Sequence, residues 1–213
     1  YQRTYNHYLK YVGNVGQDLA EAIFSFVQYR PMPVTQLVQN SLNQEGFINF
    51  GWRSWEGTFP TSIVEDCSKN SALSKKTIAY YDEAVKTSVN RLHPLTDYFH
   101  KDARPDKFGG TALTGVQPYI GNEIPNLTGT VLFTDLTLRE QSPARGVLAY
   151  TSIRGDCKLS DFSVIETDYD FGSESAYYVS LGTNLNQTKL YLGVYSSMKV
   201  TEYNKGTIFE IVP

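Results

Sequence analysis

Apolar and polar residues alternate along residues 188–203, which read TKLYLGVYSSMKVTEY. Leu190, Leu192 and Val194 fall on one side of this alternation, and Tyr191 and Tyr195 fall on the other. A period of two residues is typical of a β-strand, whose successive side chains point to opposite faces of a sheet. A strand of about 14 residues would extend over roughly 46 Å, whereas the usual strand has five or six residues. We therefore expect this strand to curve around the rest of the domain.

The same alternation recurs, less cleanly, throughout the C-terminal part of the chain, residues 129–213. Segments rich in Gly, Pro, Asn, Asp and Ser separate the candidate strands, and such residues favour tight turns. Short connections of this kind indicate an antiparallel β meander. The further candidate strands are residues 130–140, 146–154, 161–171, 176–182 and 207–212.

Two stretches in the N-terminal half have the spacing of amphipathic helices. Residues 11–28 place apolar side chains at steps of three and four, and the prolines of residues 30–33 would end that helix. Residues 71–92 carry a stripe that includes Tyr81, Val85 and Val89, and Pro94 follows its end. The sequence thus predicts helices at 11–28 and 71–92.

The remaining segments complete the predicted fold. Residues 34–65 are expected to form mixed strands, and residues 93–128, which lack a clear period, are expected to form an extended connection. We expect a single α+β domain over residues 1–213. In it, two amphipathic helices pack on a long, curved, mostly antiparallel sheet that can close into a barrel or tube.

Composition limits the class of function. The chain has 213 residues and a net charge of −3, whereas a nucleic-acid-binding domain normally carries a basic face. Only 19% of the residues are charged and 16 are Tyr, a balance that favours a secreted protein over a cytosolic one. No apolar run approaches the roughly 20 residues that a membrane-spanning helix needs. We therefore expect an extracellular protein without nucleic-acid or transmembrane roles.

Two features are consistent with secretion. In an oxidising compartment Cys67 and Cys157 would pair, and closing so long a loop would restrict the unfolded chain by about 4 to 5 kcal/mol; two free buried thiols remain the alternative. Asn126 and Asn186 begin glycosylation sequons. The Asn, Ser and Thr content predicts about as many sequons by chance, so they add little to the argument.

Catalytic and metal-binding motifs are absent from the sequence. His93 and His100 lie near Asp97 and Asp102, but a zinc site needs a third ligand at tight spacing, and Pro94 interrupts the segment. We interpret these residues as a polar loop at a helix end. No glycine-framed serine and no glycine-rich phosphate loop occurs. The sequence therefore predicts a protein that is not an enzyme and needs no cofactor.

Three acidic residues alternate on one side of a candidate strand, Glu166, Asp168 and Asp170. Paired carboxylates can hydrolyse glycosides or bind calcium weakly. A solvated strand face explains the same pattern, and we favour that interpretation.

One segment carries a family resemblance. Residues 127–138 show the pattern Leu-x-Gly-x-x-x-Phe-x-Asp-Leu-x-Leu, after an amphipathic segment and a connection rich in Pro and Gly. This order resembles the tubular lipid-binding proteins, in particular the arthropod mite group 7 allergens and the takeout and juvenile-hormone-binding proteins. The resemblance covers roughly residues 74–155. It implies a curved antiparallel sheet that wraps a long helix and encloses an apolar cavity for a lipid or terpenoid, with no catalytic residue.

The chain departs from that family at its C-terminal end. The family usually continues into a long helix after the sheet, whereas this sequence stops at Pro213. The predicted helix at 11–28 would have to occupy that place from the other end of the chain.

The functional hypothesis is a secreted, non-catalytic carrier of a hydrophobic small molecule such as a fatty acid, terpenoid or pigment. Burial of apolar ligand surface would drive binding. An alternative is a structural or self-associating extracellular domain, in which Tyr-rich faces meet another copy. A third hypothesis, a hydrolase, would need a cluster of buried carboxylates or histidines in a cleft. The predicted ligand-binding residues are Tyr81, Val85, Val89, Leu190, Leu192, Val194, Met198, Phe50 and Trp52.

Overall fold

β-Strands dominate the part of the chain that the structure describes. The computed structural model describes residues 7–17, 19–29, 48–52, 55–60, 92–101, 107–153, 159–199 and 201–213. A three-residue 3-10 helix, η2 (Pro125–Leu127), accompanies the strands. The strands are β1 (His7–Asn14), β2 (Ala20–Tyr29), β3 (Trp55–Glu56), β4 (Phe59–Pro60), β5 (Thr96–Phe99), β6 (Leu113–Tyr119), β7 (Thr130–Asp135), β8 (Val147–Ser152), β9 (Phe162–Ile165), β10 (Tyr177–Thr183), β11 (Leu190–Tyr195) and β12 (Gly206–Ile211).

The strands form three main antiparallel sheets and one short hairpin. We call β1-β2-β5 the N-terminal sheet, β6-β7-β8-β9 the central sheet and β10-β11-β12 the C-terminal sheet; β3 and β4 form the hairpin. None of the sheets that the structure describes closes on itself, so the expected barrel or tube is wrong. The predicted meander is also not one sheet, because it divides between β9 and β10.

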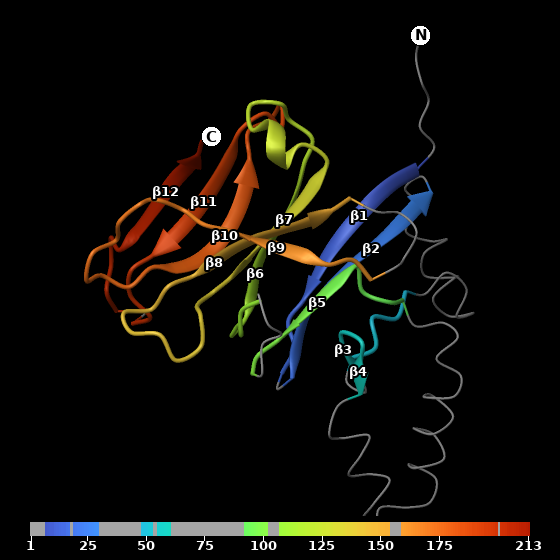
Figure 1. Cartoon of the computed structure of the whole chain (residues 1–213), viewed down its shortest axis with the longest axis horizontal. Helices are drawn as coiled ribbons and strands as arrows, with labels where there is room; N and C mark the ends of the chain where they lie inside the picture. The colour runs from blue at the N-terminus through green and yellow to red at the C-terminus, as the bar shows by residue number, and fades with distance from the viewer. Residues whose placement is uncertain are drawn as a thin grey trace, which may run out of the picture.

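The central sheet lies between the other two (Figure 1). All six residues of β7 are buried, because each face of this strand meets a different core. Val131 and Phe133 point toward the N-terminal sheet, whereas Leu132, between them, points toward the C-terminal sheet. Strands buried on both faces lack a polar side, and residues 131–133 of β7 are three consecutive apolar residues. The domain is therefore a three-layer β structure.

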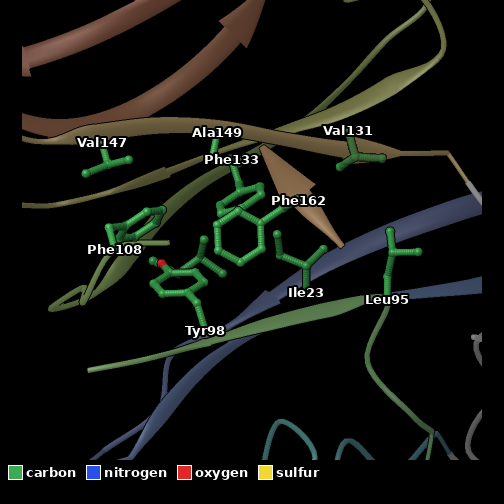
Figure 2. Close-up of a cluster of buried hydrophobic side chains, with 10 residues drawn as sticks. Ile23, Leu95, Tyr98, Phe108, Val131, Phe133, Val147, Ala149 and Phe162 are labelled. Atoms are coloured by element: carbon green, nitrogen blue, oxygen red, sulfur yellow. The ribbon is translucent and has the colours of Figure 1, made fainter. Parts of the chain in front are cut away.

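The first core fills the space between the N-terminal and central sheets (Figure 2). Four aromatic rings occupy its centre, with Phe133 stacked on Tyr98 at 5.7 Å and edge-on to Phe162 at 5.5 Å between ring centroids. Phe108 packs against Tyr98 at 4.8 Å. Such aromatic pairs add about 0.5 to 1.5 kcal/mol each beyond the burial of their surface. The buried members of this core are Ile23, Leu95, Tyr98, Phe108, Leu113, Val131, Phe133, Val147, Ala149 and Phe162.

The second core lies between the central and C-terminal sheets. Backbone hydrogen bonds also tie these layers together, since the amide of Tyr178 donates to the carbonyl of Leu136 at 3.1 Å. The hydroxyl of Thr114 on β6 donates to the carbonyl of Tyr178 at 2.6 Å. The buried members are Tyr119, Ile124, Leu127, Leu132, Leu148, Ala176, Tyr178, Leu190, Leu192 and Val194.

The predicted helix at 11–28 is wrong, because these residues belong to β1, a turn and β2. The register pairs Tyr11 with Ser25 and Asn14 with Ala22. Residues 20–25 of β2 are all buried, so their sequence shows no period of two that would reveal a strand. Periodicity alone does not separate a short buried strand from a helix. The observed pairing of β1 with β2 is favoured by the aromatic and β-branched residues of both strands and by Gly13 and Gly16, which are poor helix formers.

The C-terminal strand predictions are largely confirmed with shorter bounds. β7, β8, β9, β10 and β12 fall within or at the edge of the expected segments. The long strand at 188–203 is wrong, since β11 ends at Tyr195 and residues 196–205 lead back into β12. The extended connection at 93–128 is also wrong, because it contains β5 and β6.

The described part of residues 34–65 contains the β3-β4 hairpin and the bridge residue Asn49. The predicted helix at 71–92 lies outside the described residues, except for Leu92, which is not helical. Across the described ranges no α-helix is present, so the α+β class with two helices on a sheet is not observed. Nor does any helix in those ranges have the length and hydropathy to cross a membrane.

Candidate functional site

The clearest surface feature is the outer edge of β12 (Figure 1). β12 pairs with β11 on one side and with no other described strand on its second side. The amide of Ser196 donates to the carbonyl of Lys205 at 3.0 Å, so Lys205 points toward β11. Backbone groups of successive residues point to opposite sides of a strand. Gly206, Ile208 and Glu210 therefore direct their amide and carbonyl groups away from β11, to the free edge.

This edge lacks the features that usually prevent strand addition. Natural edge strands carry prolines, inward-pointing charges or bulges, or they are very short. β12 spans six residues, contains no proline and pairs with β11 without a register shift. Its single charged residue, Glu210, forms an ion pair at 2.7 Å with Lys189, which directly precedes β11. Ile208 is 77% exposed in the middle of the strand. The edge is therefore a regular, apolar template for another strand.

A second feature is a buried pair of ionisable groups between the N-terminal and central sheets. Nε2 of His100, just after β5, lies 2.5 Å from Oε1 of Glu21 on β2. The other carboxylate oxygen of Glu21 accepts a hydrogen bond from the amide of Leu113 on β6 at 2.9 Å. Both side chains are buried, with His100 5% exposed and Glu21 fully buried. The pair joins three strands from two sheets.

Asp135 forms the neighbouring polar centre at the end of β7. Its carboxylate accepts hydrogen bonds from the hydroxyl of Tyr98 at 2.9 Å and from the amides of Thr111, Ala112 and Thr137 at 2.9 to 3.1 Å. A Cβ atom placed on Gly110 would lie 2.3 Å from Oδ2 of Asp135, so only glycine permits this approach. The carboxylate thus fixes the loop between β5 and β6.

Burial and neighbouring charges shift the pKa values of these groups. The hydrogen bond to Glu21 raises the pKa of His100, and its proximity to Glu21, Glu56 and Asp135 reinforces this against the cost of desolvation. Desolvation raises the pKa of Asp135 in spite of hydrogen bonds from Thr111, Tyr98 and Thr137. Desolvation, followed by the charge of Asp135, raises the pKa of Tyr98 well above its ordinary value. Tyr98 therefore remains a hydrogen-bond donor, and His100 favours the charged form.

A pocket of about 530 Å³ opens beside this buried cluster. His100 lines it together with residues from the loop after β7. The amide of Arg139 donates to the carbonyl of Gly109 at 3.2 Å, which connects two of its walls. The lining residues are His100, Lys101, Gly109, Leu138, Arg139, Glu140 and Gln141.

The raised pKa of His100 predicts how stability depends on pH. The unfolded side chain titrates near its ordinary pKa of 6.5, below the folded value. Stabilisation by the charged pair is therefore complete below about pH 6.5 and is lost as the pH rises through the folded pKa. We expect the difference in unfolding free energy between the wild type and His100→Gln to be largest near pH 5.5 and to shrink toward pH 9, as measured by urea denaturation.

His93→Gln is the matched control, because His93 is exposed and does not line the pocket. The same comparison for His93→Gln should give only a small difference in unfolding free energy, because the substitution lies at an exposed position. A difference for His100→Gln that is constant or grows with pH would contradict the assignment of a stabilising charged pair.

The structure places the predicted ligand-binding residues in different environments. Leu190, Leu192 and Val194 are buried in the second core, where they pack against other core side chains. Met198 is 59% exposed after β11, and Trp52 is exposed. Phe50 packs on Phe24 with ring centroids 4.9 Å apart. Tyr81, Val85 and Val89 lie outside the described residues, so the binding role of the set stays a prediction.

The other predicted features are placed as follows. Cys67 and Cys157 lie outside the described residues. Asn126 in η2 and Asn186 in the turn between β10 and β11 are both exposed, as a glycan would require. The exposed residues Glu166, Asp168 and Asp170 follow β9.

The residues considered for metal binding are not gathered into a site. Asp97 accepts hydrogen bonds from the amide and hydroxyl of Thr58 at 2.9 and 2.7 Å. His100 pairs with Glu21, and Asp102 lies outside the described residues. Within the ranges that the structure describes, no three His, Cys, Asp or Glu side chains are arranged to hold a metal ion.

Sequence reasoning missed the buried polar cluster. Glu21 lies within the segment predicted as the helix at 11–28, and Asp135 lies within the family pattern at residues 127–138. The available signal was a Glu within the apolar run AEAIFSF of β2, because a charged residue inside a buried strand needs a partner. The partner, His100, lies 79 residues away, so the sequence does not identify it.

Comparisons with known proteins leave the chain without an assigned family. No protein-family model, no curated protein and no solved structure matches it. Its function is therefore inferred from the structure alone.

Proposed function

We propose that this chain is a non-catalytic, self-associating structural domain whose copies join through the free edge of β12. The observation that supports the proposal is the regular, unprotected edge presented by Gly206, Ile208 and Glu210. A second strand that pairs with this edge would satisfy its exposed amide and carbonyl groups. The C-terminal sheets of two copies would then become one continuous sheet.

A second copy of this chain fits the edge because antiparallel pairing of identical strands has two-fold symmetry. With the axis at Ile208, Gly206 of each copy lies opposite Glu210 of the other, and Ile208 lies opposite Ile208. All three edge-facing residues then exchange hydrogen bonds. This register also keeps the two Glu210 side chains from facing each other directly, which like charges disfavour.

The outer face of the C-terminal sheet supports the same role. Tyr191 and Tyr195 alternate with the buried residues of β11, and Tyr177 lies opposite Tyr195 on β10. Tyr side chains supply large contact areas that tolerate partial exposure, and they are enriched at protein interfaces. Joining two edges would extend this tyrosine-bearing face across the pair. The hydrophobic carrier stays a prediction, because three of its nine residues lie outside the described part of the chain.

The variant Ile208→Pro tests the proposal. The amide of Ile208 points to the free edge, so its loss removes no hydrogen bond within the sheet, and proline is tolerated at such positions. In the dimer, the substitution removes the hydrogen bonds that the two Ile208 amides would donate, and each such bond contributes about 0.5 to 1.5 kcal/mol. We expect sedimentation equilibrium to show association of the wild type and an association constant about 5- to 140-fold lower for Ile208→Pro.

Ile208→Thr is the matched control, because it removes the exposed apolar side chain and keeps the amide. We expect it to associate more tightly than Ile208→Pro, and both variants to keep the circular dichroism spectrum of the wild type. A wild type that sediments as a monomer at every concentration, or an Ile208→Pro protein that associates as the wild type does, would refute the proposal.

A further inference from the structure

The pocket beside His100 combines a buried ionisable base with two unpaired cations. Lys101 lies next to His100 on one wall, and Arg139 lies on the wall formed by the loop after β7. Neither cation forms an ion pair in the described part of the chain, although Glu140 also lines the pocket. Unpaired Arg and Lys side chains at a concave site are the groups that bind carboxylates and phosphates. The balance of charge at the pocket mouth therefore favours an anion.

His100 adds a possible hydrogen-bond donor to the lining of the pocket. Its Nε2 atom faces the Glu21 carboxylate, which accepts hydrogen bonds only, so Nε2 carries a proton. The ring itself lines the pocket, and Nδ1 is the ring nitrogen that Glu21 does not contact. When the ring is protonated, Nδ1 becomes a donor. The groups that face His100 are Glu21, Glu56 and Asp135 on the buried side and Lys101, Arg139 and Glu140 at the pocket.

We propose that this pocket binds a small metabolite through a carboxylate or phosphate group, held by Arg139, Lys101 and protonated His100. The buried carboxylates behind the ring hold it in the donating form, and Glu21 fixes its orientation through the second nitrogen. The volume of about 530 Å³ lies within the range of small-molecule sites. The site is independent of the β12 edge, because none of its lining residues belongs to the C-terminal sheet.

Sulfate is the first probe, because its charge is constant between pH 5 and pH 8 and any pH dependence then belongs to the protein. We expect isothermal titration calorimetry at fixed ionic strength to show saturable binding with an affinity several-fold higher at pH 5.5 than at pH 8. Arg139→Gln and Lys101→Gln should each weaken binding by at least about threefold, and Glu140→Gln should strengthen it. Titrations with acetate and with inorganic phosphate then show whether the pocket binds a carboxylate or a phosphate group more tightly.

Lys205→Gln is the matched control, since it removes the same charge from an exposed position near β12. It should bind sulfate as the wild type does. Because Arg139 is exposed and its side chain forms no ion pair with the residues that the structure describes, its variant remains folded. Absence of saturable binding, or equal weakening by Arg139→Gln and Lys205→Gln, would overturn the proposal. Ile208→Pro should bind sulfate normally, so failure of this site and failure of the self-association proposal are distinguishable.

Discussion

Replacement of Phe133 by Ala is expected to reduce the free energy of unfolding by about 3 to 5 kcal/mol, the usual cost of removing a buried aromatic side chain. Phe133 is fully buried at the centre of the first core (Figure 2). The substitution removes the ring that contacts both Tyr98 and Phe162, and it leaves a cavity between two sheets that are fixed by their own hydrogen bonds. Because a domain is stable by only about 5 to 15 kcal/mol, the effect is a large part of the total.

Urea denaturation followed by circular dichroism measures this effect. Leu185→Ala is the matched control, because Leu185 is 99% exposed in the turn between β10 and β11 and its change should alter the unfolding free energy by less than about 0.5 kcal/mol. Similar midpoints for the two variants would show that the first core does not hold the N-terminal and central sheets together.

Replacement of Asp135 by Ala is expected to destabilise the fold by about 4 kcal/mol or more, because several donors lose their acceptor at once. The orphaned groups are the hydroxyl of Tyr98 and the amides of Thr111, Ala112 and Thr137. Each buried donor without a partner costs about 1 to 3 kcal/mol. Asp135→Asn should have an intermediate effect, because its amide oxygen still accepts while its NH₂ group faces other donors.

Asp168→Asn is the control for this prediction. Asp168 is exposed in the segment after β9, so the same change of charge there should be nearly neutral. The three variants can be compared by thermal unfolding at neutral pH. An Asp135→Ala protein as stable as Asp168→Asn would mean that the loop between β5 and β6 does not depend on this carboxylate.

The sequence predicted the strands of the C-terminal sheet because one face of that sheet packs in the second core and the other faces solvent. In β11, Leu190, Leu192 and Val194 are buried while Tyr191 and Tyr195 are partly exposed, and this difference produces the period of two. β2, in contrast, does not show a period of two. Ile23 packs in the first core and Phe24 packs on Phe50, so successive positions of residues 20–25 are buried and the alternation disappears.

The division into three layers is not visible in the sequence, because local patterns do not show that strand pairing breaks between β9 and β10. The polar cluster also escaped prediction, since Glu21 meets His100 only after β2 pairs with β5, and meets Leu113 only after the N-terminal and central sheets pack together. The residues that form the free edge of β12 were correctly placed in a strand. Whether the backbone groups of these residues are unpaired depends on the order of strands in the C-terminal sheet, which local patterns do not specify.

The most direct test of self-association through β12 is amide hydrogen exchange, resolved by residue, at low and high protein concentration. We expect the amides of Ile208 and Glu210 to exchange rapidly in dilute solution and to become protected as the concentration rises. The amides of Thr207 and Phe209, which point toward β11, should be protected under both conditions. If Ile208 and Glu210 exchange at the same fast rate at every concentration, the edge does not pair and the chain does not assemble in this way.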